Sequence, residues 1–237
     1  MTHTALITGA TQGLGAETAA RLAAEGWTVW LGARDATAGE DVAAQIRSSR
    51  TAADVRVVQL DVTSDASVGR AREAVSGSGT GLDVLVNNAG VSGDPLPPAA
   101  TTADDVGAVF EVNVLGPVRV THAFLPLLRR AAQPRLVMVS SSLGSFATVE
   151  SRDPRAVLAW GMVYPASKAA LNMLTTMYAK ALPDVRVTAV APGFTATRLN
   201  GFSGTQTVAE GAEAIVEACV ADELSGCFIG RDGITPW

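Results

Sequence analysis

The 237-residue sequence has few cysteines and histidines. Cys219 and Cys227 are the only cysteines, which excludes the dense disulfide framework of a small secreted domain. His3 and His122 lie far from them in the chain, so the sequence predicts no metal site. The N-terminus lacks the basic start and long apolar stretch of a signal peptide, and no apolar run approaches the roughly 18 residues of a membrane span. We therefore expect a reduced, cytoplasmic protein with no membrane segment.

Charge is also scarce. Charged residues make up 17% of the chain, against roughly 25% in an average globular protein, and 18 basic residues stand against 23 acidic ones. Nucleic acids and anionic membranes are bound by clustered Lys and Arg, so neither is expected as a partner. Hydrophobic residues reach 48%, which supplies a large core and excludes a disordered chain or a coiled coil. The length fits one domain over residues 1–237.

Short apolar runs alternate with longer segments of helical period. This alternation is typical of a parallel sheet with helices on both faces, and so predicts an α/β fold. Seven strands are expected in one sheet, at Ala5–Thr8, Thr28–Gly32, Val55–Leu60, Val84–Asn87, Leu136–Ser140, Arg186–Ala191 and Cys227–Gly230. Helices are expected at Ala16–Glu25, Ala38–Ser48, Ser67–Val75, Asp104–Ala131, Tyr164–Leu182 and Ala209–Val220.

Two stretches do not follow the alternation. Residues 141–162 and 193–205 are both longer than the usual connections between strands and helices. Each follows a predicted strand, and long loops at the carboxyl ends of parallel strands are where α/β proteins bind ligands. We therefore expect both stretches to flank a ligand site.

Glycine is abundant, at 23 residues or about a tenth of the chain, against a usual share of roughly 7%. Three glycines stand in the segment Thr8-Gly-Ala-Thr-Gln-Gly-Leu-Gly15, between the first predicted strand and a helix. Glycines at these places permit a sharp turn, close approach of the backbone to a phosphate, and tight helix packing. The helix N-terminus then offers free N–H groups to a pyrophosphate; the alternative is a simple tight turn. The candidate cofactor-binding residues here are Gly9, Thr11, Gln12, Gly13, Leu14 and Gly15.

Further motifs follow in a fixed order. With its Gly-x-x-x-Gly-x-Gly loop, the chain resembles the classical short-chain dehydrogenase/reductase family, and the resemblance covers essentially the whole sequence. It implies a doubly wound, Rossmann-type sheet in a single domain. The other matching segments are Asn87-Asn88-Ala89-Gly90, Glu111-Val112-Asn113-Val114, Val139-Ser140-Ser141-Ser142-Leu143-Gly144, Tyr164-Pro165-Ala166-Ser167-Lys168 and Pro192-Gly193-Phe194-Thr195-Ala196-Thr197.

The Tyr-x-x-x-Lys segment carries the expected chemistry. Tyr164 and Lys168 are four residues apart, so a helix places both side chains on one face. An ammonium beside a phenol favours the phenolate, so we expect Lys168 to lower the pKa of Tyr164 toward working pH and make it the general acid of a reduction. The resemblance implies that Lys168 also holds the nicotinamide ribose. The alternative for Tyr164 is a helix tyrosine packed under a loop.

Two further catalytic residues are implied by the resemblance. Ser141 would bond the substrate oxygen, with Ser140 and Ser142 as competing candidates and a turn role as the alternative. Asn113 would order a water that relays protons. Its alternative is a polar helix residue satisfied by backbone groups.

The end of the second predicted strand bears on the choice of dinucleotide. By resemblance, the carboxylate of NAD-binding members would fall at Ala33, while Arg34 follows directly and suits a 2′-phosphate. NADP(H) is therefore the expected cofactor, with NAD(H) as the alternative. Asp35 could neutralise Arg34, and Gln12 stands where many NADP-preferring members have a basic residue. Other expected cofactor-binding residues are Asp61, Val62, Asn88, Ala89, Gly90, Tyr164, Lys168, Pro192, Gly193, Thr195 and Thr197; for Asp61 a helix-capping role is the alternative.

Within the family, the chain looks most like carbonyl reductases, which reduce ketones and aldehydes with NADPH. Apolar residues in the two long loops suit an apolar carbonyl or alcohol as substrate: Phe146, Val149, Trp160, Met162, Phe194, Leu199 and Phe202. The alternatives are a catalytically quiet module that senses dinucleotides, and sugar-nucleotide chemistry on the related extended fold, which needs a larger substrate domain. The resemblance also implies a homodimer or homotetramer, although residues 141–162 exceed the compact family pattern by about ten residues.

Overall fold

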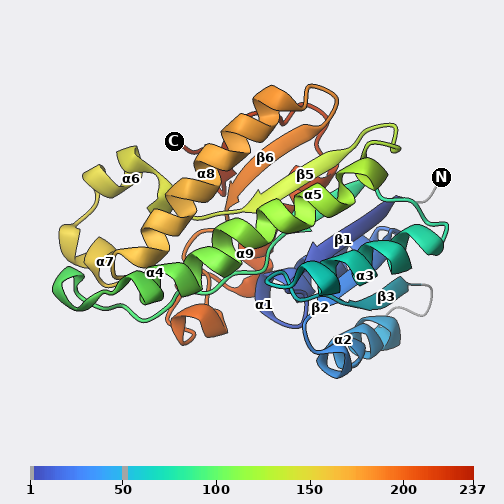
Figure 1. The fold of residues 1–237 in the computed structure, drawn as a ribbon, viewed down its shortest axis with the longest axis horizontal. Coiled ribbons are helices and arrows are strands. Elements are labelled where there is room, and N and C mark those ends of the chain that lie inside the picture. The colour runs from blue at the N-terminus through green and yellow to red at the C-terminus, as the bar shows by residue number, and fades with distance from the viewer. Residues whose placement is uncertain (1–2, 50–52) are drawn as a thin grey trace.

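Eight strands form one sheet in the computed structural model, which describes residues 3–49 and 53–237 (Figure 1). The strands are β1 Thr4–Thr8, β2 Thr28–Ala33, β3 Asp54–Gln59, β4 Val84–Asn87, β5 Arg135–Val139, β6 Arg186–Ala191, β7 Cys227–Gly230 and β8 Gly233–Ile234. The α-helices are α1 Gly13–Ala24, α2 Ala36–Ser49, α3 Asp65–Gly77, α4 Ala103–Phe110, α5 Gly116–Leu128, α6 Phe146–Ser151, α7 Pro154–Leu158, α8 Val163–Ala181 and α9 Val208–Val220.

The strand order is β3-β2-β1-β4-β5-β6-β7-β8. Every neighbouring pair from β3 to β7 is parallel, which confirms the predicted α/β class and its seven parallel strands. Strand β8 is an antiparallel addition that the sequence did not indicate, because two residues are too short to show a period. From β1 the chain adds β2 and β3 toward one edge of the sheet, and from β4 it adds β5 to β8 toward the other edge. This reversal opens a crevice at the carboxyl ends of β1 and β4, where doubly wound proteins bind ligands.

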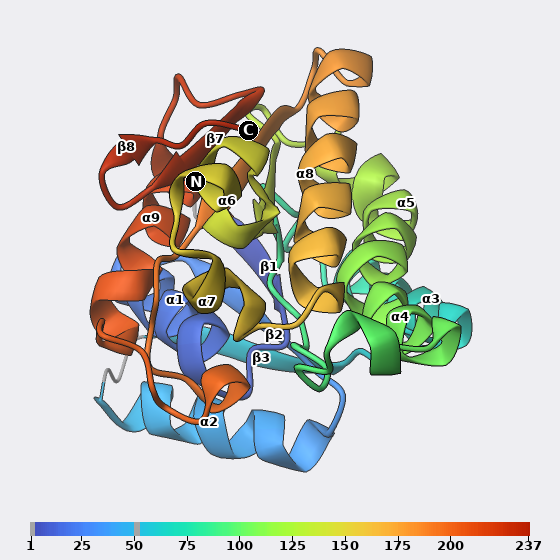
Figure 2. The same ribbon diagram turned by 90° about the vertical axis from the view of Figure 1, so that its left-hand side faces the viewer.

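Helices cover both faces of the sheet in two layers (Figure 2). Alternate residues of each strand enter opposite cores because side chains alternate along a strand. On β1, Ile7 packs in the core under α1, α2 and α9, whereas Leu6 packs in the core under α3, α5 and α8. The strands are therefore apolar on both sides, which accounts for the low charge of the sequence.

The prediction of a single long helix over Asp104–Ala131 is wrong at the centre of that range. The chain there forms α4, then a π-helical turn at Glu111–Leu115, then α5. Pro117 lacks an amide hydrogen, so it cannot donate to the carbonyl of Asn113 four residues earlier, and the regular ladder is interrupted. The irregular turn carries Asn113, which is fully buried.

The two long connections contain short helices. Residues 141–162 hold a 3₁₀ turn at Ser142–Gly144 followed by α6 and α7, and residues 193–205 hold a 3₁₀ turn at Arg198–Asn200. Helices α6 and α7 stand together beside the start of α8 (Figure 1). Both connections follow the carboxyl ends of central strands, β5 and β6. They therefore lie at the same edge of the sheet as the glycine-rich loop.

Candidate active site

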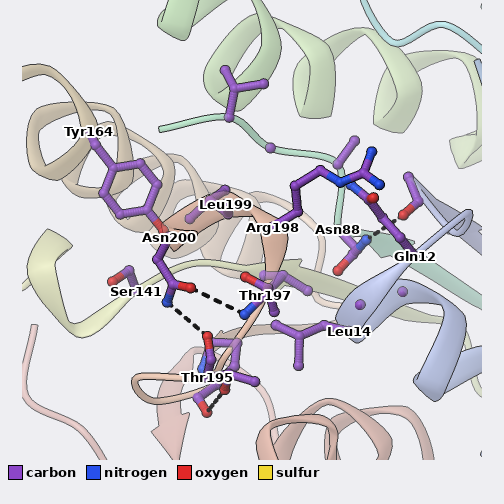
Figure 3. A pocket seen from close by; sticks show the side chains of 18 of the residues that line it. Gln12, Leu14, Asn88, Ser141, Tyr164, Thr195, Thr197, Arg198, Leu199 and Asn200 are labelled. Carbon is purple, nitrogen blue, oxygen red and sulfur yellow. Dashed lines mark hydrogen bonds between the residues drawn. The ribbon is translucent and has the colours of Figure 1, made fainter. Parts of the chain in front are cut away.

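One cavity of about 950 Å³ runs along the carboxyl edge of the sheet. Figure 3 shows part of its lining, with Tyr164 at one end and Gln12 and Asn88 at the other. The structure brings all but one of the catalytic and cofactor-binding residues that the sequence singled out to its walls. These are Gly9, Thr11, Gln12, Gly13, Leu14, Gly15, Arg34, Asp61, Val62, Asn88, Ala89, Gly90, Ser141, Tyr164, Lys168, Pro192, Gly193, Thr195 and Thr197; Asn113 alone is not among the lining residues.

The glycine loop has no room for side chains. Gly9 is in the left-handed region at φ +64°, and a Cβ there would lie 2.9 Å from the Cα of Ala89. A Cβ on Gly15 would lie 2.7 Å from the carbonyl oxygen of Gly9. The turn after β1 is thus packed directly against the turn after β4. The clearance left by these glycines forms the cradle that a pyrophosphate requires.

Thr8 ties the two turns together, although the sequence analysis did not single it out. Its hydroxyl accepts hydrogen bonds from the backbone N–H groups of Asn88 and Ala89, each at 3.0 Å. The side-chain amide of Asn88 in turn donates to the carbonyl oxygen of Thr8 at 2.8 Å. Asn88 therefore fixes the shape of the glycine loop as well as lining the cavity.

Helix α1 begins without the caps used elsewhere in the chain. The side chain of Gln12 makes no capping hydrogen bond, and the first turn of α1 has no acidic residue. In contrast, Ser64, Thr102 and Thr207 cap the N-termini of α3, α4 and α9 with their side chains. The first N–H groups of α1 therefore remain free for an anion in the cavity.

Four cations and two carboxylates belong to the charged lining: Arg34, Arg152, Lys168 and Arg198 against Asp35 and Asp61. The cavity is thus cationic although the whole chain is acidic. The carboxylate of Asp35 accepts from the backbone N–H groups of Thr37 and Ala38 at the start of α2. No ion pair joins it to Arg34 in the described part of the chain. Asp35 is thus occupied by the helix terminus rather than by Arg34, whose charge acts instead on Asp61.

Asp61 also has a local partner. Its carboxylate accepts hydrogen bonds from the backbone N–H and the hydroxyl of Thr63, at 2.9 and 2.7 Å. These bonds hold the pKa of Asp61 below its ordinary value. The capping alternative raised for Asp61 is wrong, because Ser64 caps α3 and Thr63, the partner of Asp61, lies before that helix. Its position in the cavity wall is the one expected for a cofactor-binding residue.

Tyr164 and Lys168 lie together on the first turns of α8 and are 6% and 4% exposed. The ammonium Nζ of Lys168 donates to the carbonyl oxygen of Val139 at 2.9 Å and lies 5.6 Å from the centre of the Tyr164 ring. The hydroxyl of Ser141, at the end of β5, acts on the phenol of Tyr164 and lowers its pKa. The ends of β5 and α8 thus converge on one phenol.

The three consecutive serines have different environments. Ser140 is buried and donates to the side-chain oxygen of Asn172 at 2.5 Å. Ser142 accepts from the guanidinium of Arg152 at 3.2 Å. The hydroxyl of Ser141 accepts from the backbone N–H of Leu143 at 3.2 Å, which is the turn role raised as its alternative. It is also the serine that lowers the pKa of Tyr164, as expected for the serine predicted at this point.

The predicted direction of the Tyr164 pKa is wrong for this structure. Burial raises the pKa of Tyr164 to about 12, and the hydrogen bond from Ser141, which lowers it, is the smaller effect. Burial lowers the pKa of Lys168 to about 8. Spacing along a helix predicts that the two side chains are neighbours but not that both are desolvated. Tyr164 is therefore held neutral, in the form that can donate a proton.

Asn113 lies behind the cavity wall rather than in it. Its side-chain oxygen accepts from the backbone N–H of Val91 at 2.9 Å, and its amide donates to the carbonyl of Val91 and to the hydroxyl of Ser167. Ser167 donates in turn to the backbone carbonyl of Tyr164 at 2.7 Å. The side chain of Asn113 thus links the loop after β4 to the helix that carries Tyr164.

Several lining residues were missed by the sequence analysis. Arg198 lies in the loop after β6, beside Thr197, whose methyl carbon is 3.5 Å from the Cβ position of Gly13. Asn200 holds this loop by donating to the carbonyl of Thr195 at 2.8 Å and accepting from the N–H of Thr197 at 3.1 Å (Figure 3). Single polar residues in a loop have no period, so only their nearness to the Pro-Gly segment could have drawn attention to them.

The apolar residues proposed for the substrate end divide into two groups. Trp160, Phe194, Leu199 and Phe202 line the cavity. Phe146, Val149 and Met162 are not among the lining residues. In the described residues 3–49 and 53–237 there is no group of three or more His, Cys, Asp or Glu side chains that could hold a metal ion. No helix in those same residues is long and apolar enough to span a membrane.

The strand order of the parallel sheet reverses at the glycine cradle, and a buried Tyr–Lys–Ser cluster lies in the same cavity. Together these features define a Rossmann-type oxidoreductase. The family model for short chain dehydrogenases matches residues 3–207. The chain therefore belongs to the short-chain dehydrogenase family.

Similar proteins include both dehydrogenases and reductases. Short-chain dehydrogenase anuI of Penicillium roqueforti (strain FM164) is 37% identical over 222 residues, which cover 90% of this chain and 86% of that protein. The (+)-neomenthol dehydrogenase of Arabidopsis thaliana is 30% identical, with 98% of this chain and 97% of that protein covered. Among solved structures, NADPH-bound carbonyl reductase from chicken fatty liver superposes with a TM-score of 0.86 at 26% identity, and covers 100% of this chain and 99% of its own.

Proposed function

We propose that the protein is an NADP(H)-dependent reductase of ketones and aldehydes that also oxidises the corresponding alcohols. The observation that carries this proposal is the neutral, buried Tyr164, which lies with Ser141 and Lys168 in the same cavity as the glycine cradle. An acid at one end and an anion-binding cradle at the other are the two parts that carbonyl reduction by a dinucleotide requires.

The cradle fits a dinucleotide in both shape and charge. The glycines leave backbone clearance, the N-terminus of α1 is free of side-chain caps, and Arg34 stands at the end of β2 without a bonded carboxylate. A guanidinium there would bind a 2′-phosphate, and Ala33 provides no carboxylate to accept from a ribose 2′-hydroxyl. These features support NADP(H) over NAD(H). The NADPH-bound carbonyl reductase of similar fold adds to that support.

When bound, the nicotinamide supplies the hydride that a carbonyl carbon accepts. The work of the protein is to place and protonate the carbonyl oxygen. Tyr164 donates its phenolic proton to that oxygen, and the hydroxyl of Ser141 donates a second hydrogen bond to it. Lys168 supplies a nearby positive charge as the phenolate forms. Asn113 acts as a positioning residue through Val91 and Ser167.

The alternative of a dinucleotide-sensing module differs in one respect: such a module needs the cradle but not the acid. A panel of ketones and aldehydes, tested with NADPH and with NADH, distinguishes the two. We expect NADPH to be consumed and an alcohol to form, faster than with NADH. Tight NADPH binding without turnover of any carbonyl in the panel would contradict the enzyme and favour the sensor.

We also propose that the chain associates with copies of itself through the outer face of α8. Met173 and Met177 lie one turn apart on this face, and both are exposed. Large apolar side chains grouped on a helix surface favour burial against a partner. Sedimentation of the protein should show a dimer or tetramer, and Met173→Lys with Met177→Lys should shift it to the monomer. A monomeric wild-type protein would contradict this proposal.

A further inference from the structure

Two aromatic side chains pack in series beside the proposed catalytic phenol. The indole of Trp160 is stacked on the ring of Tyr164, with ring centres 5.2 Å apart and planes inclined by 26°. Phe194 meets Trp160 edge-on, with centres 6.1 Å apart and an angle of 77°. Trp160 comes from the connection after β5 and Phe194 from the connection after β6. The pair, which we call the aromatic wall, thus joins the two long loops at the substrate end.

The backbone around Trp160 is fixed on two sides. Gly161 is left-handed at φ +63°, and a Cβ there would lie 3.0 Å from the Cα of Pro95. The N–H of Trp160 donates to the carbonyl of Val157 at the end of α7, at 3.1 Å. The segment after β4 and helix α7 therefore fix the backbone that carries the indole, while the indole itself contacts the rings of Tyr164 and Phe194. A side chain positioned by two separate segments is preorganised for its contact rather than free to adopt many rotamers.

The wall leaves limited room for a substrate beside the phenol. Lys168 lies over the ring of Tyr164, and the hydroxyl of Ser141 acts on the phenol. The groups flanking a carbonyl at that hydroxyl must therefore extend toward Trp160 and Phe194. The same loops add further apolar residues to the lining, namely Ala156, Ala159, Leu199 and Phe202, next to the polar Arg152, Arg198 and Asn200.

Two phenylalanines of the loop after β6 are unusually exposed for their size. Phe194 is 42% exposed and Phe202 is 67% exposed, although both line the cavity. Phe202 is also the one left-handed non-glycine residue among the described residues, at φ +61°, and its N–H donates to the carbonyl of Thr197 at 2.8 Å. Exposed aromatic rings and a strained backbone at a cavity mouth are typical of groups that a ligand covers.

On the basis of the proposed function, we infer that Trp160 and Phe194 are specificity-determining residues that select ketones whose carbonyl is attached to a flat, conjugated ring. Aromatic rings attract one another in offset-stacked or edge-on arrangements, beyond the effect of the area that they bury. A flat ring attached to the carbonyl can contact both members of the wall while the oxygen lies at Tyr164. A flexible acyclic chain lacks the π face and loses more conformational freedom on binding.

The test compares an aryl methyl ketone with an acyclic methyl ketone of equal carbon number. Wild-type protein should favour the aryl ketone, and Trp160→Leu should lower kcat/KM for it about tenfold, mainly through KM. The same change should alter kcat/KM for the acyclic ketone by less than about threefold. Phe194→Leu, on an exposed loop, should give a smaller loss of the same selectivity. Phe146→Leu is the matched control, because Phe146 is 74% exposed on the same connection as Trp160 but is absent from the lining.

Equal losses for both ketones in Trp160→Leu and Phe194→Leu, or no loss for either, would overturn the inference. Binding of the aryl ketone, followed as quenching of tryptophan fluorescence that is absent in Trp160→Leu, separates this inference from the proposed function. Quenching without reduction of either ketone would reject the reductase and support the wall. Reduction of the acyclic ketone with no preference for the aryl ketone would support the reductase and reject the wall.

Discussion

The two ends of the cavity are built in different ways. At the cofactor end, the walls are main chain: glycines that clear space, helix N–H groups, and hydrogen bonds from Thr8 and Asn88 that join two turns. At the substrate end, the walls are side chains delivered by separate loops, such as Trp160 and Phe194. The main-chain cradle combines two short segments, each with a recognisable sequence motif, that the strand pairing of β1 and β4 brings together. A side-chain wall depends on how distant loops pack, so its specificity can change without altering the cradle.

The largest expected effect is that of removing the phenolic oxygen of Tyr164, which should impair the substrate end and leave the cofactor end intact. Tyr164→Phe removes the proton donor but retains the ring that packs against Trp160. We expect kcat for ketone reduction to fall by about 10²–10⁴, while the affinity for NADPH changes little. Steady-state kinetics and equilibrium binding of NADPH measure the two effects. Comparable losses of turnover and of NADPH affinity would show that the ends are not separable in this way.

The converse change targets the cradle. A Cβ on Gly15 would come within 2.7 Å of the Gly9 carbonyl, so Gly15→Ala should destabilise the fold by about 2 kcal/mol and weaken NADPH binding. Gly69→Ala is the control, because no atom lies within 4 Å of a Cβ at Gly69 in α3. That variant should gain about 0.5–1 kcal/mol from helix propensity. Urea unfolding measures both values, and equal effects at the two positions would contradict the close packing described for Gly15.

Burial of Lys168 has a consequence for stability that depends on pH. Its pKa is about 8 in the folded protein and about 10.4 in the unfolded chain. Because the charged form is disfavoured by burial, the destabilisation is fully present below pH 8 and is relieved as pH rises toward about 10.4. Lys168→Met should therefore stabilise the fold at pH 7 by about 2 kcal/mol, after allowance for the lost hydrogen bond to Val139.

Chemical denaturation of Lys168→Met at pH 7 and at about pH 10 checks this sign. The gain should shrink at the higher pH, and the variant should be inactive at both. A variant less stable than wild type at pH 7 would indicate that Lys168 stabilises the substrate end rather than straining it.

The smallest expected effect concerns the charge at the cofactor end. Arg34→Ala should reduce the preference for NADPH over NADH about tenfold, because a charge-assisted contact with the 2′-phosphate is lost. Arg152→Ala is a useful control, since Arg152 lines the same cavity but lies on the connection after β5. The ratio of kcat/KM for the two dinucleotides reports the change. An unchanged ratio in Arg34→Ala would assign the 2′-phosphate to another cation of the lining.

The difference between the main-chain cradle and the side-chain wall also explains which features could be predicted from the sequence. The strands and the glycine loop follow local spacing, so β4, β6 and β7 have the bounds expected from the sequence, and the cradle lies where the glycines predicted it. The π-helical turn at Glu111–Leu115 and the pairing of β8 were not foreseen, because each depends on contacts beyond its own segment. Pro117 was the available signal for the break in the helix.

At the substrate end, the sequence predicted that Tyr164 and Lys168 are neighbours but gave the wrong sign for the phenol's pKa. Burial depends on every segment that covers the two groups, and it outweighs the local hydrogen bond. The stacking of Trp160 on Tyr164 was equally beyond the sequence, although Trp160 was among the apolar residues considered for this region. Periodicity does not report how a loop packs.

Transfer of an isotope from cofactor to substrate tests the central claim most directly. NADPH carrying deuterium at the transferred position of the nicotinamide would be incubated with an aryl ketone and the wild-type protein, and the alcohol analysed by mass spectrometry. The account predicts an alcohol with one deuterium on the former carbonyl carbon, and almost none of that product with Tyr164→Phe. An alcohol without deuterium, or NADPH that binds without forming any alcohol, would contradict it.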